Sequence, residues 1–317
     1  MTRDNSGSNA SAIHTPERSR NLEGALWLFA SGLTFTVFLT LAKFMSSTEH
    51  PAVLAFWRSF VALLVTLPVL FHFGLGYLKS DKPFLLIARS LLGTGAFLCS
   101  MYAISDAFTL PLSQFNAISF SRAMFVTILA ALLLREAVGT WRWGAVLAGF
   151  LGVVVMVLPG YVLPGFASDA IIVDGGTWLA LVSAAGFAGA IVLVKSLTAT
   201  HSPMSLLIWA NLMSSVLLAP FVFWFGGWPG YSGAGLLIAM ALAGTAGQYF
   251  YITAMSVGDA SFLAPIDYLR LPMAALADLL VFQLFPGLNV WLGAAIIVSA
   301  TLLITWRESR QRRVQKS

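Results

Sequence analysis

Three ionisable side chains lie within one apolar stretch near the end of the chain, residues 260–285. The stretch is long enough to cross a bilayer, since a spanning helix needs about 20 mostly apolar residues, yet it carries Asp267, Arg270 and Asp278. At about 100° per residue, a single helix would place Asp267 and Asp278 on nearly the same face, with Arg270 to one side. Charged side chains inside hydrocarbon are costly and face a protein interior or a water-filled cavity. We therefore expect one continuous helix whose polar stripe faces a path through the membrane.

The charges of this stretch leave alternatives open. Asp267 and Arg270 are three positions apart, so they either neutralise each other on one helix or contact a gate or a substrate. Asp278 has no oppositely charged residue within four positions. A buried carboxyl group without a partner is suited to loading and releasing a proton, whereas an ion pair with Arg122 would hold it ionised. Both interpretations of Asp278 are consistent with the sequence.

A second apolar stretch, residues 110–134, carries Arg122 about twelve residues from either end. That depth is too great for the side chain to reach the membrane surface easily. On a helix, Gln114 lies on a face that has Arg122 at its edge. A guanidinium group binds carboxylates through a rigid fork of donors. We expect Arg122 either to bind an anion such as a carboxylate, or to form a structural ion pair with Asp278 or Asp267.

Lys43 and Lys195 are basic residues at the ends of two apolar segments, 152 positions apart. If their segments are symmetry mates in an inverted repeat, the two lysines lie at opposite membrane faces. Such a pair suits gate residues that alternate, and Lys195 suits a plain interfacial anchor equally well.

Interior aromatic and amide side chains form a further group of candidates. Most aromatic residues in apolar helices serve packing, yet a cavity lined by rings and amides would suit a flat organic solute with polar edges. Besides Gln114, the candidates for such a lining are Trp57, Tyr102, Trp209, Gln248 and Tyr268, together with Phe115, Asn116 and Asn211.

The composition is that of a membrane protein with many spans. Of 317 residues, 58% are hydrophobic and 10% are charged, whereas soluble domains carry about 25% charged residues. Short loops rich in proline and glycine separate ten apolar segments, which cover residues 24–46, 51–73, 84–105, 110–134, 143–163, 177–197, 203–225, 234–257, 260–285 and 288–306. We predict an all-α polytopic membrane protein with ten transmembrane helices.

Basic residues indicate the orientation in the membrane. One set of alternate loops holds Lys79, Lys82, Arg135 and Arg142. By the positive-inside rule, both termini are cytoplasmic. Residues 1–22 are polar and predict a disordered tail, and residues 308–317 predict a basic tail suited to an anionic membrane surface. Because the net charge of +5 gathers at this end, we expect the lipid bilayer and not a nucleic acid as its partner.

Metal, cofactor and ATP chemistry find no support in the sequence. Cys99 is the single cysteine, and the four histidines show no i, i+4 pair of the kind that a helical zinc site uses. The chain also has no G-x-x-x-x-G-K-[ST] loop for a nucleotide phosphate. We expect no metal site and no cofactor.

An internal repeat is visible at a constant shift. Five residues recur 152 positions later: Lys43, Pro51, Trp57, Pro68 and Gly74 match Lys195, Pro203, Trp209, Pro220 and Gly226. Since each unit holds five segments, an odd number, the second unit enters the membrane from the opposite side. We predict two inverted five-helix repeats, residues 23–165 and 175–307, an arrangement typical of secondary transporters.

Four local sequence motifs add to the evidence from the segments and the repeat. They are F-W-R at 56–58, A-R-S-L-L-G-T at 88–94, L-L-L-R-E at 132–136 and L-A-P-I-D-Y-L-R-L-P at 263–272. With the ten segments, the repeat and the basic tail, the chain resembles the EamA type of the drug/metabolite transporter superfamily over about residues 22–308. The motifs resemble a bacterial branch that includes proteins assigned to riboflavin or S-adenosylmethionine uptake.

The chain departs from the family pattern in two places. The acidic residue that family members carry near the end of the ninth segment is replaced around Phe285 and Pro286, although its counterpart Glu136 is present. Arg122 stands where relatives have small or apolar residues. The resemblance therefore implies the family more strongly than it implies the substrate.

These features predict a secondary active transporter that moves a small organic metabolite across the bacterial cytoplasmic membrane by alternating access. The solute would be a vitamin, a nucleoside-like or an amino-acid-like compound, with a proton or an exchanged solute as the coupling partner. A channel is the first alternative, but the sequence shows no filter motif or charged ring. An intramembrane enzyme is the second; it would need clustered nucleophile and base residues or metal ligands, so we expect no enzyme activity. The direction of transport and the oligomeric state stay open.

Overall fold

The computed structural model describes residues 17–74, 79–80, 82–108, 110–133, 140–157, 175–197, 201, 203–225, 231–257, 263, 266–267 and 269–314. Every regular element among these residues is an α-helix. The helices before residue 160 are α1 (Glu17–Met45), α2 (Pro51–Phe73), α3 (Pro83–Ile104), α4 (Leu112–Ser119), α5 (Arg122–Leu133) and α6 (Thr140–Val157). Those after residue 170 are α8 (Gly175–Leu197), α9 (Pro203–Trp224), α10 (Tyr231–Val257), α12 (Arg270–Phe282) and α13 (Leu288–Val314).

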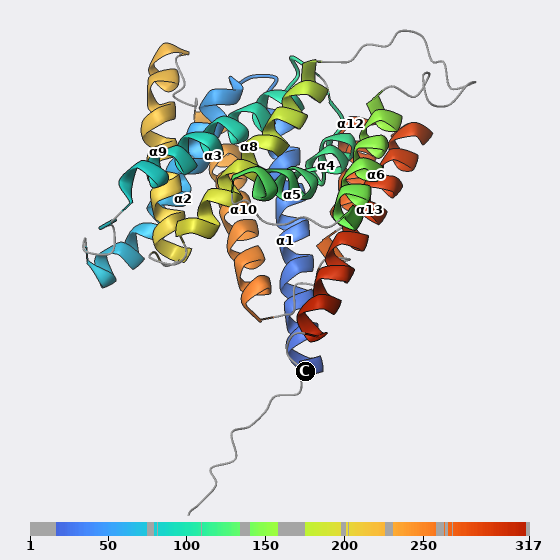
Figure 1. The fold of residues 1–317 in the computed structure, drawn as a ribbon. Helices are drawn as coiled ribbons and strands as arrows, with labels where there is room; N and C mark the ends of the chain where they lie inside the picture. The colour runs from blue at the N-terminus through green and yellow to red at the C-terminus, as the bar shows by residue number, and fades with distance from the viewer. Residues whose placement is uncertain are drawn as a thin grey trace, which may run out of the picture.

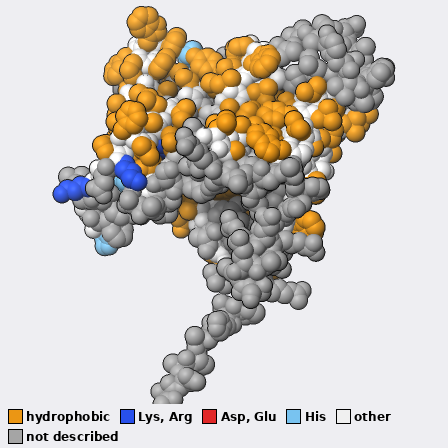
Figure 2. All heavy atoms as spheres, in the orientation of Figure 1, with side chains coloured by type: hydrophobic (Ala, Val, Ile, Leu, Met, Phe, Trp, Pro, Cys, Tyr) orange, Lys and Arg blue, Asp and Glu red, His pale blue; other side chains and the backbone are white. Residues whose placement is uncertain are grey.

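Six of the described helices are long and apolar enough to cross a membrane, namely α1, α2, α3, α8, α9 and α10. Shorter apolar helices run through Val146–Val155 of α6 and Leu288–Ala300 of α13. Hydrophobic side chains dominate the coloured surface in Figure 2, and basic side chains gather at one edge of it. Such an apolar exterior is what lipid contact requires. A polytopic all-α membrane protein is thus confirmed, while the count of ten spans stays a prediction.

Helices from the first half of the chain pack against helices from the second half. Figure 1 shows α1 beside α10 and α6 beside α13, and α3 and α2 pack in the same way on α8 and α9. Glycine permits the closest of these approaches. A Cβ at Gly247 of α10 would lie 2.9 Å from the ring of Phe35 on α1, and one at Gly152 of α6 would lie 2.8 Å from the carbonyl oxygen of Gly293 on α13. Helix pairs at this spacing are typical of membrane bundles.

The fourth apolar segment is interrupted near its centre. α4 ends at Ser119 and α5 begins at Arg122. Between them the Ser121 amide donates to the carbonyl of Ile118, three residues back, at 2.9 Å, and the Ser121 hydroxyl donates to the same carbonyl at 2.6 Å. Bonds of this spacing tighten a helix, and a serine that bonds back to the preceding turn bends it. The single helix predicted over 110–134 is therefore wrong, and Arg122 starts a helix.

The ninth segment is also not one continuous helix. α12 begins at Arg270, and Pro272 occupies its first turn, where a missing amide hydrogen removes no helical hydrogen bond. Asp267 lies ahead of this start, so it shares no continuous helix with Asp278. The polar stripe predicted for one helix over 260–285 is wrong for this reason.

The chain ends differ slightly from expectation. α1 begins at Glu17, inside the stretch that was predicted to be a disordered tail, and α13 runs to Val314 through most of the basic tail. The first turns of α1 and the last turns of α13 lie at the same end of the bundle in Figure 1. Which membrane face this end occupies stays a prediction.

Candidate functional site

A cavity of about 340 Å³ lies among helices from both ends of the chain. Its lining comes from α1, α2, α3, α4, α5, α8, α9, α10 and the first residue of α12. Sites for small molecules in proteins enclose roughly 300–1,000 Å³ and combine apolar walls with a few polar groups. The cavity is therefore large enough for one small organic molecule.

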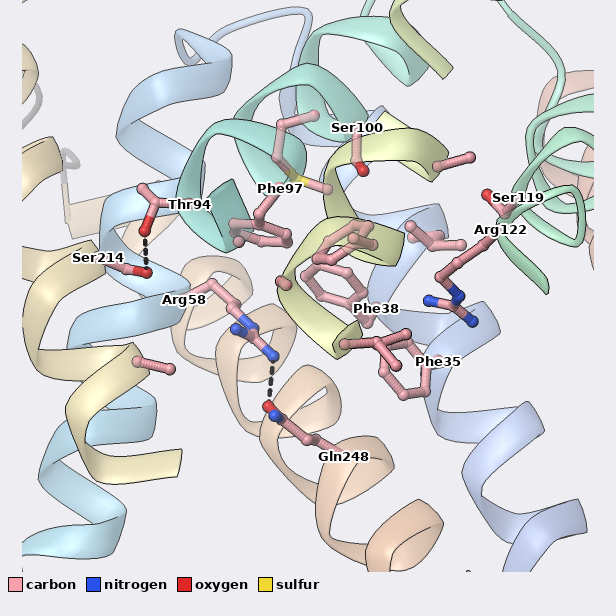
Figure 3. Close-up of a pocket in the computed structure, with 18 of the residues that line it drawn as sticks. Phe35, Phe38, Arg58, Thr94, Phe97, Ser100, Ser119, Arg122, Ser214 and Gln248 are labelled. Carbon is pink, nitrogen blue, oxygen red and sulfur yellow. Dashed lines mark hydrogen bonds between the residues drawn. The ribbon is translucent and has the colours of Figure 1, made fainter. Parts of the chain in front are cut away.

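Four arginines line this space, which we call the arginine cavity. Arg58 comes from α2 and Arg89 from α3, while Arg122 and Arg270 are the first residues of α5 and α12. In Figure 3, Arg58 and Arg122 lie on two sides of Phe38. The interruptions of the fourth and ninth segments thus place two helix starts, each with an arginine, at one cavity.

Arg58 and Arg89 make few polar contacts with the protein. A terminal nitrogen of Arg58 donates to the Gln248 side-chain oxygen at 2.7 Å, and its guanidinium carbon lies 4.9 Å from the ring centre of Phe97. Arg89 donates to the carbonyl of Leu206 at 3.5 Å, the upper limit for such a bond. The Nε atom of each arginine is buried without a hydrogen-bond partner. Both guanidinium groups thus keep unused donors in a buried position.

Of the four arginines that line the cavity, Arg122 has the weakest side-chain contacts. Its guanidinium carbon lies 6.0 Å from the ring centre of Phe187, the outer limit of a cation–π contact. Among the described residues, no carboxylate pairs with Arg58, Arg89 or Arg122. The predicted ion pair of Arg122 with Asp278 or Asp267 is accordingly not formed in the structure.

Arg270 and Asp267 form the one ion pair of the described cavity region. Nε of Arg270 and Oδ1 of Asp267 lie 3.0 Å apart, which agrees with mutual neutralisation, one of the two roles that the sequence left open for this pair. Both atoms are buried, and the contact between them is an ion pair without the geometry of a hydrogen bond. Arg270 also donates to the Ser31 hydroxyl at 3.3 Å and lies 4.9 Å from the ring centre of Phe35.

The remaining lining combines rings with small polar groups. The rings are those of Phe35, Phe38, Phe97, Phe115 and Phe187, and the polar groups include Thr94, Asn116, Asn211, Ser214 and Gln248. Thr94 and Ser214 bond each other through their hydroxyls at 2.6 Å (Figure 3). Gln248, Asn116, Asn211 and Phe115 are the members of the predicted lining that the structure brings together here.

Asp278 lies outside the lining of the arginine cavity and is fully bonded. It is 0% exposed. Its carboxylate accepts hydrogen bonds from the amide of Leu112 at 2.9 Å, the amide of Ser113 at 2.8 Å and the Ser113 hydroxyl at 2.7 Å. These donors form the start of α4, where the helix dipole also favours a negative charge. Asp278 therefore caps α4 from α12.

Lys43 lies next to this cap. It is 4% exposed, donates to the carbonyl of Leu110 at 2.9 Å and lies 4.8 Å from the ring centre of Phe282. We call Asp278, Lys43, Leu110, Leu112 and Ser113 the Asp278 cluster. The cluster ties α1, the start of α4 and α12 together.

Several other predicted site residues lie away from the cavity lining. Trp57 packs against Phe56 and Phe60, and Trp209 packs beside the buried cluster of Leu86, Leu197 and Leu206. The Tyr102 hydroxyl lies 3.2 Å from Nε2 of His50 at the start of α2. Gln114 is half-buried on α4 but does not line the cavity. Tyr268 and the side chain of Lys195 lie outside the described part of the chain.

The sequence prediction did not include Arg58 and Arg89 among the site residues. Both lie only five to seven residues inside their segments, a depth from which a long basic side chain can reach the membrane surface. The signal that could have identified them is their charge, because an ionisable residue within a span marks a functional site by default.

Comparison with known proteins places this geometry in context. Residues 22–158 and 175–306 each match the model of the "EamA-like transporter family". A riboflavin transporter from Rhizobium johnstonii is 31% identical over 310 residues, which cover 94% of this chain and 95% of the relative. An S-adenosylmethionine uptake transporter from Rickettsia prowazekii is 27% identical over 289 residues, which cover 91% and 94%. A solved crystal structure shares the fold with a TM-score of 0.60 at 19% identity, covering 92% of this chain and 99% of that chain.

Proposed function

Because the chain belongs to the EamA-like transporter family, we propose that it is a secondary active transporter for a small organic metabolite, with the arginine cavity as its substrate site. The observation that carries this proposal is the position of the cavity, whose lining comes from both family-matched parts of the chain. Secondary transporters bind their substrates where two structural repeats meet. Relatives named for riboflavin and S-adenosylmethionine transport support a small metabolite as the cargo.

The helix contacts support an inverted repeat. If α8 repeats α1 and α10 repeats α3, the α1–α10 and α3–α8 packings are the same contact formed twice. The α2–α9 and α6–α13 packings then join each helix to its own mate. This pattern is expected for two five-helix units related by a twofold axis in the membrane plane, and such units alternate access by rocking about the site.

The interruption between α4 and α5 supplies a hinge for this motion. Tightened turns within helices often mark functional hinges, and irregular backbone at membrane depth is tolerated where it lines a cavity. Ser119 and Arg122, on either side of the turn, both line the arginine cavity. Rotation at this turn would move α5, together with the Arg122 guanidinium, relative to α4.

For Asp278 we propose a positioning role in place of proton coupling. Both of its carboxylate oxygens already accept hydrogen bonds from the start of α4, so the side chain is engaged in holding the fold. A carboxylate held in this way fixes the start of α4, and thereby the hinge that follows seven residues later at Ser119. The coupling partner would then be an exchanged solute or a proton carried elsewhere.

Solute counterflow in proteoliposomes tests the proposal. Vesicles with the purified chain are loaded with unlabelled riboflavin or S-adenosylmethionine and diluted into trace labelled solute. A carrier gives transient uptake of label above equilibrium, because the abundant unlabelled solute inside occupies the inward-facing site and leaves outward in place of the label. A channel gives only equilibration, and an enzyme gives chemically altered label. Absence of counterflow for these solutes and for the anions named below would count against the transporter.

A further inference from the structure

The arginine cavity holds more positive charge than the protein neutralises. Four guanidinium groups line it, and Asp267 is the one described carboxylate that pairs with any of them. Arginine is also the only ionisable residue type in the described lining. Three arginines, Arg58, Arg89 and Arg122, therefore face the cavity without a partner of opposite charge among the described residues.

These three groups also have donors to spare. A guanidinium offers five N–H donors. Arg58 makes one short bond, to the neutral side chain of Gln248, and Arg89 makes one long bond, to a backbone carbonyl. The Nε atoms of both are buried and unbonded. Buried donors and charges that stay unmatched are costly, so their persistence indicates a function that only a ligand completes.

The chemistry of the missing partner follows from these groups. A guanidinium fork matches the oxygens of a phosphate or a carboxylate, and it does so more strongly where water is excluded. Between the arginines, rings such as Phe35 and Phe38 offer flat apolar surface for an aromatic body. A cationic ligand would be repelled by the arginines that line the cavity.

We propose that the cargo is a small organic anion, with a phosphate or carboxylate bound by Arg58, Arg89 and Arg122 and a flat body packed on the phenylalanines. The inference rests on the proposed function, because it names the substrate class of the same cavity. It also separates this chain from relatives that carry S-adenosylmethionine, whose sulfonium group is a cation.

Matched ligand pairs test the charge directly. The purified full chain in detergent is titrated with riboflavin and with riboflavin 5′-phosphate, which share the flavin ring, and with indole-3-acetamide and indole-3-acetate. Flavin binding is read from quenching of flavin fluorescence, and indole binding from calorimetry. The expected result is at least about tenfold tighter binding of the anionic member of one pair, the gain typical of a charge-assisted bond. The two pairs also distinguish phosphate from carboxylate.

The pH dependence gives a second readout for the phosphate. A phosphate monoester loses its second negative charge below pH ~6, so binding of riboflavin 5′-phosphate should weaken between pH 7 and pH 5 by about threefold or more. Riboflavin binding should not change over this range, because the described lining contains no group that titrates there.

Arginine variants assign the effect to the cavity. Arg122→Gln and Arg58→Gln should reduce the preference for the anion about tenfold, while Lys82→Gln, which removes an exposed charge ahead of α3, should leave it unchanged. Arg122→Lys should restore part of it, since the charge returns without the fork. Equal affinity within both pairs, absence of binding in both, or a preference that survives in both arginine variants would overturn the inference.

The binding assay needs no transport, so the two proposals can fail separately. Anion-selective binding without counterflow would leave this inference standing and remove the transporter. Counterflow of riboflavin or S-adenosylmethionine with no preference for anions would support the transporter and overturn this inference.

Discussion

The Asp278 cluster holds a fully buried charge that the protein satisfies, whereas the arginine cavity holds half-buried charges, most of which have no partner of opposite charge among the described residues. The Asp278 carboxylate is 0% exposed and accepts three hydrogen bonds from the start of α4. Arg58, Arg89 and Arg122 lack an acidic partner among the described residues, and two of them keep buried Nε donors without a bond. A charge that the protein satisfies stabilises the fold, whereas a charge left unsatisfied is available to a ligand.

This contrast predicts opposite effects on stability. Removing a satisfied charge leaves its partners buried and unbonded, which lowers the free energy of unfolding. Removing an unsatisfied one relieves a cost that the fold already carries.

Asp278→Asn should give the largest loss of stability. The amide retains one acceptor oxygen but faces donors with its NH₂ group, so the free energy of unfolding should fall by about 3 kcal/mol. Thermal or denaturant unfolding in detergent measures the loss. The matched control is Asp106→Asn at an exposed position after α3. Equal stability of the two variants would contradict the cap on α4.

Arg270→Gln should destabilise the protein less, by about 2 kcal/mol, because it leaves the Asp267 carboxylate without its charge partner. The double variant Asp267→Asn with Arg270→Gln should recover part of this loss, since no unpaired charge remains. Strictly additive losses in the double variant would show that the 3.0 Å contact carries no coupling.

Two serines offer the finest comparison. Ser113 donates its hydroxyl to Asp278 at 2.7 Å, whereas the buried Ser90 hydroxyl at the cavity has no hydrogen-bond partner. Ser113→Ala should reduce the free energy of unfolding by about 1–2 kcal/mol, and Ser90→Ala by about 0 kcal/mol or less. The same unfolding assay compares them. A larger loss for Ser90→Ala would reverse the assignment of satisfied and unsatisfied groups.

Much of the fold could be predicted from the sequence because lipid imposes simple rules on it. α2 has the predicted bounds of 51–73, and α8 and α9 begin and end within two residues of prediction. Apolar runs and prolines fix these helices locally. The interruption at Ser121 could not be seen in this way, since serine hydroxyls bond back to the helix in many positions without breaking it.

The site was only partly predictable. Arg122 was recognised from its depth, and Gln248, Asn116 and Asn211 from polarity within apolar segments. For Asp278 the sequence left both proton exchange and an ion pair with Arg122 open, because a search by residue type finds side chains only, whereas its partners include two backbone amides. Arg58 and Arg89 could not be assigned to the cavity from the sequence, because distance from a segment end does not tell which way a long side chain points.

The unfolding of Arg122→Gln in the absence of ligand tests the central contrast most directly. We predict a free energy of unfolding equal to that of the native chain or higher by about 1 kcal/mol, beside a clear loss in Arg270→Gln measured in the same detergent. That pair of results would show that one arginine serves the fold and the other is held for a ligand. A loss in Arg122→Gln as large as that in Arg270→Gln would contradict the account, because Arg122 would then be a structural charge.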